Sequence, residues 1–166
     1  MSEIANINTA STGNINIPGI GKKRITVNDD NEKVLILNVN DANILERVTN
    51  GYSELMEWKD KYIAELSLDA DEINVNSIES WKKIVAALKP LDKKMRETLD
   101  YIFNADISSV CDDGGTMWEV LETGETRFDT LITELLRFYG DNIISNYKKM
   151  SERVSDLTKD YVKSDS

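Results

Sequence analysis

Histidine is missing from this sequence, and cysteine and proline are nearly so. The 166 residues contain no His, one Cys and two Pro. Without His, neither a Ser-His-Asp nor a Cys-His catalytic group can form, and an imidazole general base is excluded. One Cys also rules out an intramolecular disulfide and a Cys/His zinc site. The sequence therefore favours a binding protein over an enzyme, and it predicts neither a cofactor nor a metal site.

Long hydrophobic runs are missing as well. The first twenty residues lack the basic segment and the continuous apolar core of a secretory signal, and no later segment has the apolar length of a membrane span. The unpaired Cys111 suits a reducing compartment. No basic residue lies within three positions of Cys111, and Asp112 and Asp113 follow it, so we expect a raised thiol pKa and a packing role. These features predict a cytoplasmic protein with no membrane segment.

Positive charge is scarce and unevenly placed. Twenty Lys and Arg against thirty Asp and Glu give a net charge of −10, which argues against binding nucleic acid or anionic lipid. Residues 41–80 hold three basic and ten acidic residues, whereas residues 81–96 hold six basic residues and one acidic residue. We expect these segments to form antiparallel helices with their charged flanks in contact. A second hypothesis is an acidic nucleic-acid mimic that inhibits a host DNA-binding protein.

A β-hairpin is predicted near the start of the chain. Residues 24–27 and 33–39 are rich in β-branched and aliphatic residues, and the Asn and Asp residues at 28–31 between them favour a turn. The second strand is apolar at every position from Val34 to Leu37. We therefore expect both of its faces to be covered.

Two long helices are predicted from apolar residues at three- and four-residue spacing. Residues 44–66 carry one such stripe, and the polar pair Asn40-Asp41 precedes it as a cap. Residues 78–103 carry the second, with Ser77 or Ser80 as its cap. The fold class predicted is therefore mainly α, an α+β arrangement with a small N-terminal hairpin.

Three further features complete the predicted fold. Pro90 marks either a kink in the second helix or the first turn of a new helix. Residues 104–126 contain two Gly-bearing turns and predict short or irregular pieces. A third apolar stripe over residues 128–157 predicts a long C-terminal helical region, with an interruption at Gly140.

These elements predict a single domain with flexible ends. Residues 1–21 are rich in Asn, Ser, Thr and Gly and predict a flexible arm, and residues 159–166 predict a frayed tail. The helical domain then spans residues 22–158, with its hairpin at residues 24–39.

The turn after Cys111 carries the only cluster that suggests chemistry. Asp112, Asp113, Glu119 and Glu122 are close in sequence and could form a carboxylate pair or a weak divalent-ion site. A carboxylate enzyme is thus a third hypothesis. A solvated turn accounts for the same residues without any ligand, and we favour it.

Four residues are candidates for binding a partner protein. Met117 and Trp118 follow a Gly-Gly turn outside the periodic segments, where an exposed aromatic side chain can act as a hot spot. Packing of this turn onto the protein's own helices is the alternative. Tyr139 and Tyr147, on the C-terminal stripe, are the other two candidates.

The segment before the last helix resembles that of a known family. It runs from Lys94 to Cys111, and it places an acidic residue, aliphatic residues and Phe at Asp100 to Phe103, with Val110 and Gly114-Gly115 after them. With the preceding hairpin and acidic helix, it resembles the tail assembly chaperones of long-tailed phages and prophages of Gram-positive bacteria. The resemblance spans roughly residues 24 to 150, and residues 117–126 depart from it as an insertion.

The resemblance implies a non-enzymatic protein that acts in the cytoplasm of the infected or lysogenic host. It would bind the tape-measure protein, recruit tail-tube subunits and be absent from the mature virion. Such chaperones are often also made in a longer, frameshifted form, and the Lys pairs of this sequence do not decide that question. The long helices also make a homo-oligomer plausible.

Overall fold

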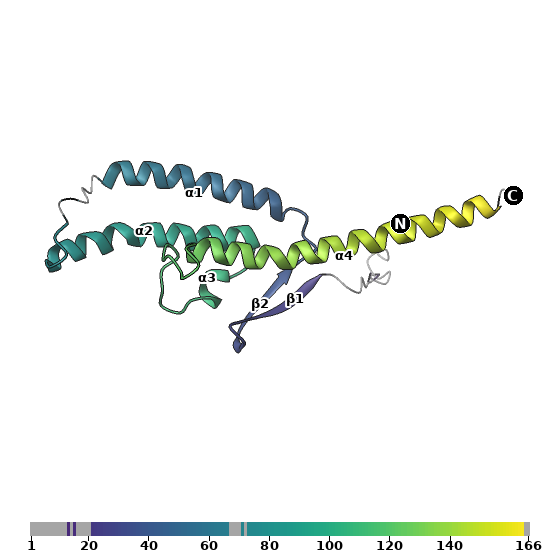
Figure 1. The fold of residues 1–166 in the computed structure, drawn as a ribbon, viewed down its shortest axis with the longest axis horizontal. Helices are drawn as coiled ribbons and strands as arrows, with labels where there is room; N and C mark the ends of the chain where they lie inside the picture. The colour runs from purple at the N-terminus through teal and green to yellow at the C-terminus, as the bar shows by residue number, and fades with distance from the viewer. Residues whose placement is uncertain (1–12, 14, 16–20, 67–70, 72, 165–166) are drawn as a thin grey trace, which may run out of the picture.

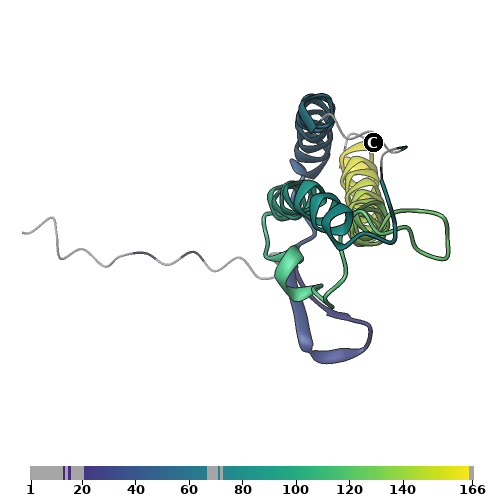
Figure 2. The same ribbon diagram turned by 90° about the vertical axis from the view of Figure 1, so that its left-hand side faces the viewer.

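The computed structural model describes residues 13, 15, 21–66, 71 and 73–164. The predicted arm at residues 1–21 lies almost entirely outside the described residues. The mainly helical fold with an N-terminal hairpin is confirmed, as Figures 1 and 2 show. In chain order the elements are β1 (Lys22–Val27), β2 (Asp30–Asn38), α1 (Ile44–Leu66), α2 (Ile78–Phe103), α3 (Ile107–Val110) and α4 (Arg127–Ser164).

A two-residue turn closes the hairpin. Asn28 and Asp29 have positive φ angles of 53° and 58°, as a type I′ turn requires, and Asn and Asp tolerate this backbone better than most residues. β1 and β2 pair antiparallel, with Thr26 opposite Val34 and a register shift beside the turn. The turn is shorter than predicted, so that β2 begins at Asp30.

Only one face of β2 is covered. Leu35 and Leu37 are buried, whereas Ile36 between them is 63% exposed. The expectation that both faces would be covered is therefore wrong. The sheet has two strands in the described chain, and the helices that cover it, α3 among them, lie on one of its sides (Figure 2).

α1 and α2 form the predicted antiparallel pair (Figure 1). Gly51 allows their close approach, because a Cβ atom at this position would lie 2.9 Å from Ile102 Cγ1 and 3.3 Å from Thr98 Cγ2. In the same region Arg47 Nε donates a hydrogen bond to the carbonyl oxygen of Ile102 at 2.7 Å. Close packing at a glycine thus holds this end of the pair together.

The charged flanks do not hold α1 and α2 together. Between the residues of these two helices, all of which are described, no ion pair forms; Lys93 pairs with Glu97 on its own helix, for example, at 3.8 Å. The Tyr62 hydroxyl instead donates to the Ala87 carbonyl. The predicted attraction between an acidic and a basic flank is therefore wrong, because the apolar faces set the rotation of the two helices.

α2 is one helix from end to end. It passes through Pro90 without ending, which rejects the alternative of a new helix at that residue. The Ser77 side chain caps its start by accepting from the Ser80 N–H. Asn104 ends the helix in the left-handed conformation, with φ of 48°, a common helix stop.

Tyr52 connects α1 to the start of α4. Its hydroxyl donates to Asp129 Oδ1 at 2.8 Å, and its ring meets the ring of Phe128 edge to face, with centroids 5.7 Å apart. Burial and the Asp129 carboxylate raise the pKa of Tyr52. The Thr126 hydroxyl accepts the N–H of Asp129 at 3.1 Å and so caps α4.

α4 continues through the predicted interruption and into the predicted C-terminal tail. Gly140 is helical and lies beside the buried Tyr139, whose packing holds that turn in place. The predicted interruption there is therefore wrong. The helix also continues beyond residue 158, where we expected the domain to end, and reaches Ser164. Its C-terminal half projects beyond the other elements (Figure 1).

The core combines side chains from every element. It fills the space between the hairpin, α1, α2, α3 and the N-terminal half of α4, and so ties the early and late parts of the chain into one unit. Its buried residues are Ile25, Leu35, Leu37, Val39, Ile44, Leu55, Met95, Leu99, Ile102, Phe103, Ile107, Cys111, Met117, Phe128, Ile132, Leu135 and Tyr139.

Candidate partner-binding surface

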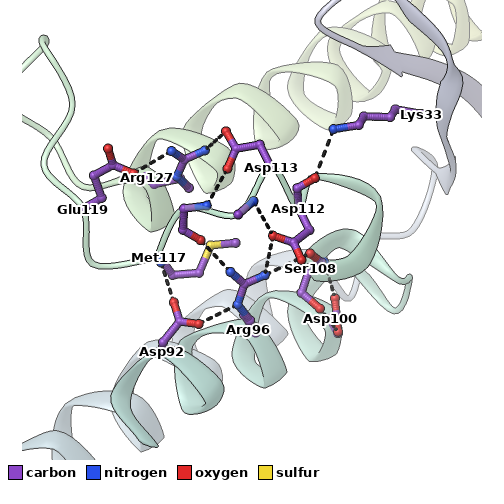
Figure 3. A network of polar contacts seen from close by, with 12 residues as sticks. Lys33, Asp92, Arg96, Asp100, Ser108, Asp112, Asp113, Met117, Glu119 and Arg127 are labelled. Atoms are coloured by element: carbon purple, nitrogen blue, oxygen red, sulfur yellow. Dashed lines mark hydrogen bonds and ion pairs between the residues drawn. The ribbon is translucent and has the colours of Figure 1, made fainter. Parts of the chain in front are cut away.

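The loop between α3 and α4 is fixed to α2 by a polar network (Figure 3). Arg96 Nε donates to Asp92 Oδ2 at 2.7 Å. Its two terminal nitrogens donate to the carbonyl oxygens of Ser108, at 3.2 Å, and Gly115, at 2.7 Å. The other oxygen of Asp92 accepts the N–H of Met117 at 2.6 Å. These bonds fix the position of the residues that follow the Gly-Gly turn.

A second arginine engages the predicted carboxylate cluster. Arg127 donates to Asp113 Oδ2 and to Glu119 Oε2, each at 2.6 Å. The N–H of Gly115, together with Arg127, lowers the pKa of Asp113 below its usual value. The two carboxylates raise the pKa of Arg127 in turn. Two of the four predicted acids therefore face an arginine rather than each other.

The other two acids are exposed. Asp112 Oδ1 lies 3.7 Å from Arg96 Nη1, and its backbone carbonyl accepts a hydrogen bond from Lys33. Glu122 lies on the surface of the loop. Within the described part of the chain, no group of three or more side chains suited to hold a metal ion was found.

Met117, Tyr139 and Cys111 are core residues. Met117 is fully buried and Tyr139 is 2% exposed; the Tyr139 ring packs near that of Phe103, and burial raises its pKa. Neither candidate therefore presents a surface to a partner, and the alternative of packing onto the protein's own helices is confirmed for Met117. Cys111 is buried as well, and burial raises its thiol pKa as expected.

Trp118 is the candidate that reaches a surface hollow. It is half-buried, and its Nε1 atom finds no acceptor among the described residues. The side chain borders an apolar groove of about 350 Å³ on α2. It also borders a smaller hollow of about 220 Å³ that includes Leu55 of α1 and Phe128 of α4. The residues lining the larger groove are Trp81, Ile84, Val85, Leu88, Lys89, Asp92, Thr116 and Trp118.

The groove exists because α4 does not extend along this end of α2. α4 begins beside the middle of α2 (Figure 1), so the apolar face of α2 is covered at Leu99 and open at Trp81 and Val85, which are 51% and 59% exposed. The apolar spacing over residues 78–103 predicted one continuous apolar stripe. It contains no signal for where the covering helix starts.

One edge of the groove is basic. Lys82, Lys89 and Lys93 follow one another at spacings of seven and four residues, which places them along one side of α2. Each is exposed. An apolar floor with a cationic edge favours an amphipathic helix that has acidic residues on its flank.

The fourth candidate, Tyr147, lies on the projecting half of α4 and is 64% exposed. It belongs to an apolar stripe that the sequence predicted as one side of a helix, and in this half no described element covers it. The exposed members of this stripe are Ile143, Ile144, Tyr147, Met150, Val154 and Leu157.

Comparisons with known proteins give no match, so a proposal about function depends on the surfaces described above. No protein-family model, curated protein or solved structure matches the chain. Among the helices described, none combines the length and apolar character needed to cross a membrane.

Proposed function

We propose that this protein is a non-enzymatic phage tail assembly chaperone that acts in the cytoplasm of the bacterial host. Its partners would be the tape-measure protein and, through that complex, the tail-tube protein. The observation that carries the proposal is the open apolar groove beside Trp118, since large exposed apolar surface on a folded chain favours a binding site. The order of a hairpin, an antiparallel helix pair and a long last helix supports the same class.

The proposed occupant of the groove is a helical segment of the tape-measure protein. From Trp81 to Asp92 the groove follows three turns of α2, about 17 Å. A helix docked there would extend the line of α4 and cover the part of α2 that α4 leaves open. Its acidic flank would face the edge formed by Lys82, Lys89 and Lys93.

Binding energy in such a groove concentrates in a few large side chains. Trp81 and Trp118 both line the groove, one from α2 and one from the loop before α4, and Trp is enriched among residues whose removal weakens a complex most. Trp118 follows a segment that is already fixed by the network around Arg96, so little conformational freedom remains for it to lose on binding. The loop that departs from the family pattern would then form one wall of the binding site.

One observation favours the second candidate, an acidic nucleic-acid mimic. Glu46, Glu54 and Glu57 on α1 are exposed, and none of the three forms an ion pair with a described residue. The lysines exposed on α2, the neighbouring helix, interrupt this acidic surface. We therefore rank the mimic below the chaperone.

The experiment is co-expression of the full chain with the long helical protein encoded by a neighbouring gene, followed by affinity capture. Val85→Asp places a charge on the floor of the groove, and we expect it to reduce the captured partner at least tenfold. Ile36→Asp is the matched control, because Ile36 is similarly exposed but lies on the hairpin. Capture that is unchanged by Val85→Asp, or capture of a basic DNA-binding protein that depends on the acids of α1, would overturn the proposal.

A further inference from the structure

The projecting half of α4 carries a heptad pattern with no described neighbour. Ile143, Tyr147, Met150, Val154 and Leu157 are separated by four, three, four and three residues, the spacing of a coiled-coil seam. Their exposed fractions run from 41% to 64%. A helix with such a seam buries it against another helix, or leaves a continuous apolar stripe in water.

This stripe is distinct from the part of α4 that packs on the core. The buried residues Phe128, Ile132, Leu135 and Tyr139 are spaced by four, three and four, and a further step of four then leads to Ile143. From Leu135 to Tyr147 there are three successive steps of four, and they shift the stripe around the helix, as residues inserted into a heptad repeat do in a coiled coil. The core seam therefore ends at Tyr139, and a second seam begins at Ile143.

Two asparagines fix which side of α4 faces the domain. Asn146 Nδ2 donates to Asn40 Oδ1 at 2.8 Å. Asn142 Nδ2 donates to the same oxygen and, at 3.4 Å, to the Val39 carbonyl. Each asparagine immediately precedes a stripe residue, so the stripe lies about 100° around the helix from this contact. The domain's own hairpin region thus leaves the stripe open.

We propose that this stripe is a self-association surface, and that its occupant is the same stripe of a second copy of this chain in a parallel two-helix coiled coil. In the heptad, Val154 takes an a position and Leu157 a d position. A β-branched residue at a and Leu at d favour parallel dimers.

The flanking charges support the parallel arrangement. Parallel pairing sets Arg153 beside Thr158 of the second copy and Asn146 beside Ser151, so that no like charges meet. Antiparallel pairing aligns only four of the five seam residues in either of its two best registers, and one of these registers sets Arg153 beside Arg153, which is destabilising. Parallel in-register pairing aligns all five. Arg153 is the one charge on these flanking positions from residue 144 to residue 158, so the flanks provide little charge complementarity to a foreign helix.

The area is sufficient for a specific though weak dimer. Each of the six exposed apolar side chains leaves roughly 100 Å² accessible, so pairing two copies removes on the order of 1,200 Å² from water, the lower end for a specific interface. The seam covers about two heptads, and short helical pairs are marginal. We expect a dimer that dissociates on dilution.

The test is sedimentation equilibrium of the purified full chain from about 1 μM to about 1 mM, a range that brackets weak complexes. We expect a monomer–dimer equilibrium for the natural chain. Val154→Asp should shift the dissociation constant at least tenfold toward monomer. Ser155→Asp, the same substitution type one position away and off the seam, should leave it unchanged. Circular dichroism checks that both variants keep their helix content.

A cross-linking arm tests the orientation. In a parallel in-register pair, Val154→Cys places two thiols opposite each other. Molecular oxygen then oxidises both to one disulfide and takes up the released protons and electrons. The natural chain is the negative control, because Cys111 is buried and cannot form this disulfide. A chain that is monomeric throughout the range, equal effects of Val154→Asp and Ser155→Asp, or no disulfide in the dimeric variant would overturn the proposal. None of these measurements requires a tape-measure partner.

Discussion

Replacement of Gly51 by alanine measures how tightly α1 packs on α2. Alanine in a helix interior is normally favoured over glycine by about 1 kcal/mol. At residue 51, however, the added Cβ would lie 2.9 Å from Ile102 Cγ1 and 3.2 Å from Ile102 Cδ1. Ile102 is fully buried and has little room to move, and overpacking of this kind costs about 1 to 3 kcal/mol. We expect Gly51→Ala to lower the free energy of unfolding by about 1 kcal/mol net.

Gly140→Ala is the matched control for this substitution. Gly140 also lies inside a helix, but a Cβ atom added there would meet no described atom within 4 Å outside its own stretch of helix, so the propensity gain of about 0.5 to 1 kcal/mol remains. Urea denaturation followed by circular dichroism gives both values. Opposite signs are expected. If Gly51→Ala stabilises the protein as much as Gly140→Ala does, the close contact between α1 and α2 is refuted.

Two further predictions concern polar contacts. Arg47 holds the pKa of Asp41 below its usual value, so this ion pair stabilises the fold above about pH 4, and the contribution is lost as the pH falls through the lowered pKa. Asp41→Asn should lower the free energy of unfolding by about 1 kcal/mol at pH 7. Urea titrations should show that the natural chain and the variant become equally stable below about pH 4. Arg96→Met should lower the free energy of unfolding by about 2 kcal/mol. It should also speed cleavage within residues 112–126 in limited proteolysis. An unchanged cleavage rate would contradict the role of Arg96 in fixing this loop.

The helices and the hairpin could be predicted because their signals are local. Spacing of apolar residues set the extent of α1 and α2, and the Asn-Asp turn set the position of the hairpin. The errors come from effects that local patterns do not contain. Gly140 and Pro90 are unfavourable within helices, yet the packing of neighbouring side chains keeps both helices continuous. Ile36 is apolar like a core residue. It stays exposed because the sheet has two strands in the described chain and is covered by helices on one side.

The candidate site was predicted only in part. Trp118 and Tyr147 lie at surfaces, whereas Met117 and Tyr139 are buried. Met117 and Trp118 are neighbours in one loop, and Tyr139 and Tyr147 lie on one helical stripe, so local context does not separate the members of either pair. Which of them is covered depends on how the loop lies against α2 and on where α4 leaves the core, both of which are tertiary relationships. The roles of Arg96 and Arg127 were missed, because each contacts loop residues that are distant in sequence or lie in an irregular segment.

The central claim is that the groove beside Trp118 binds a partner helix, and the most direct measurement is the affinity of the full chain for a labelled, acidic-flanked helical peptide from the tape-measure protein. Fluorescence anisotropy gives the dissociation constant for the natural chain, for Val85→Asp and for the hairpin control Ile36→Asp. We predict binding that weakens at least tenfold in Val85→Asp alone. Equal affinity of all three chains for the peptide, or no binding by any of them, would contradict the claim.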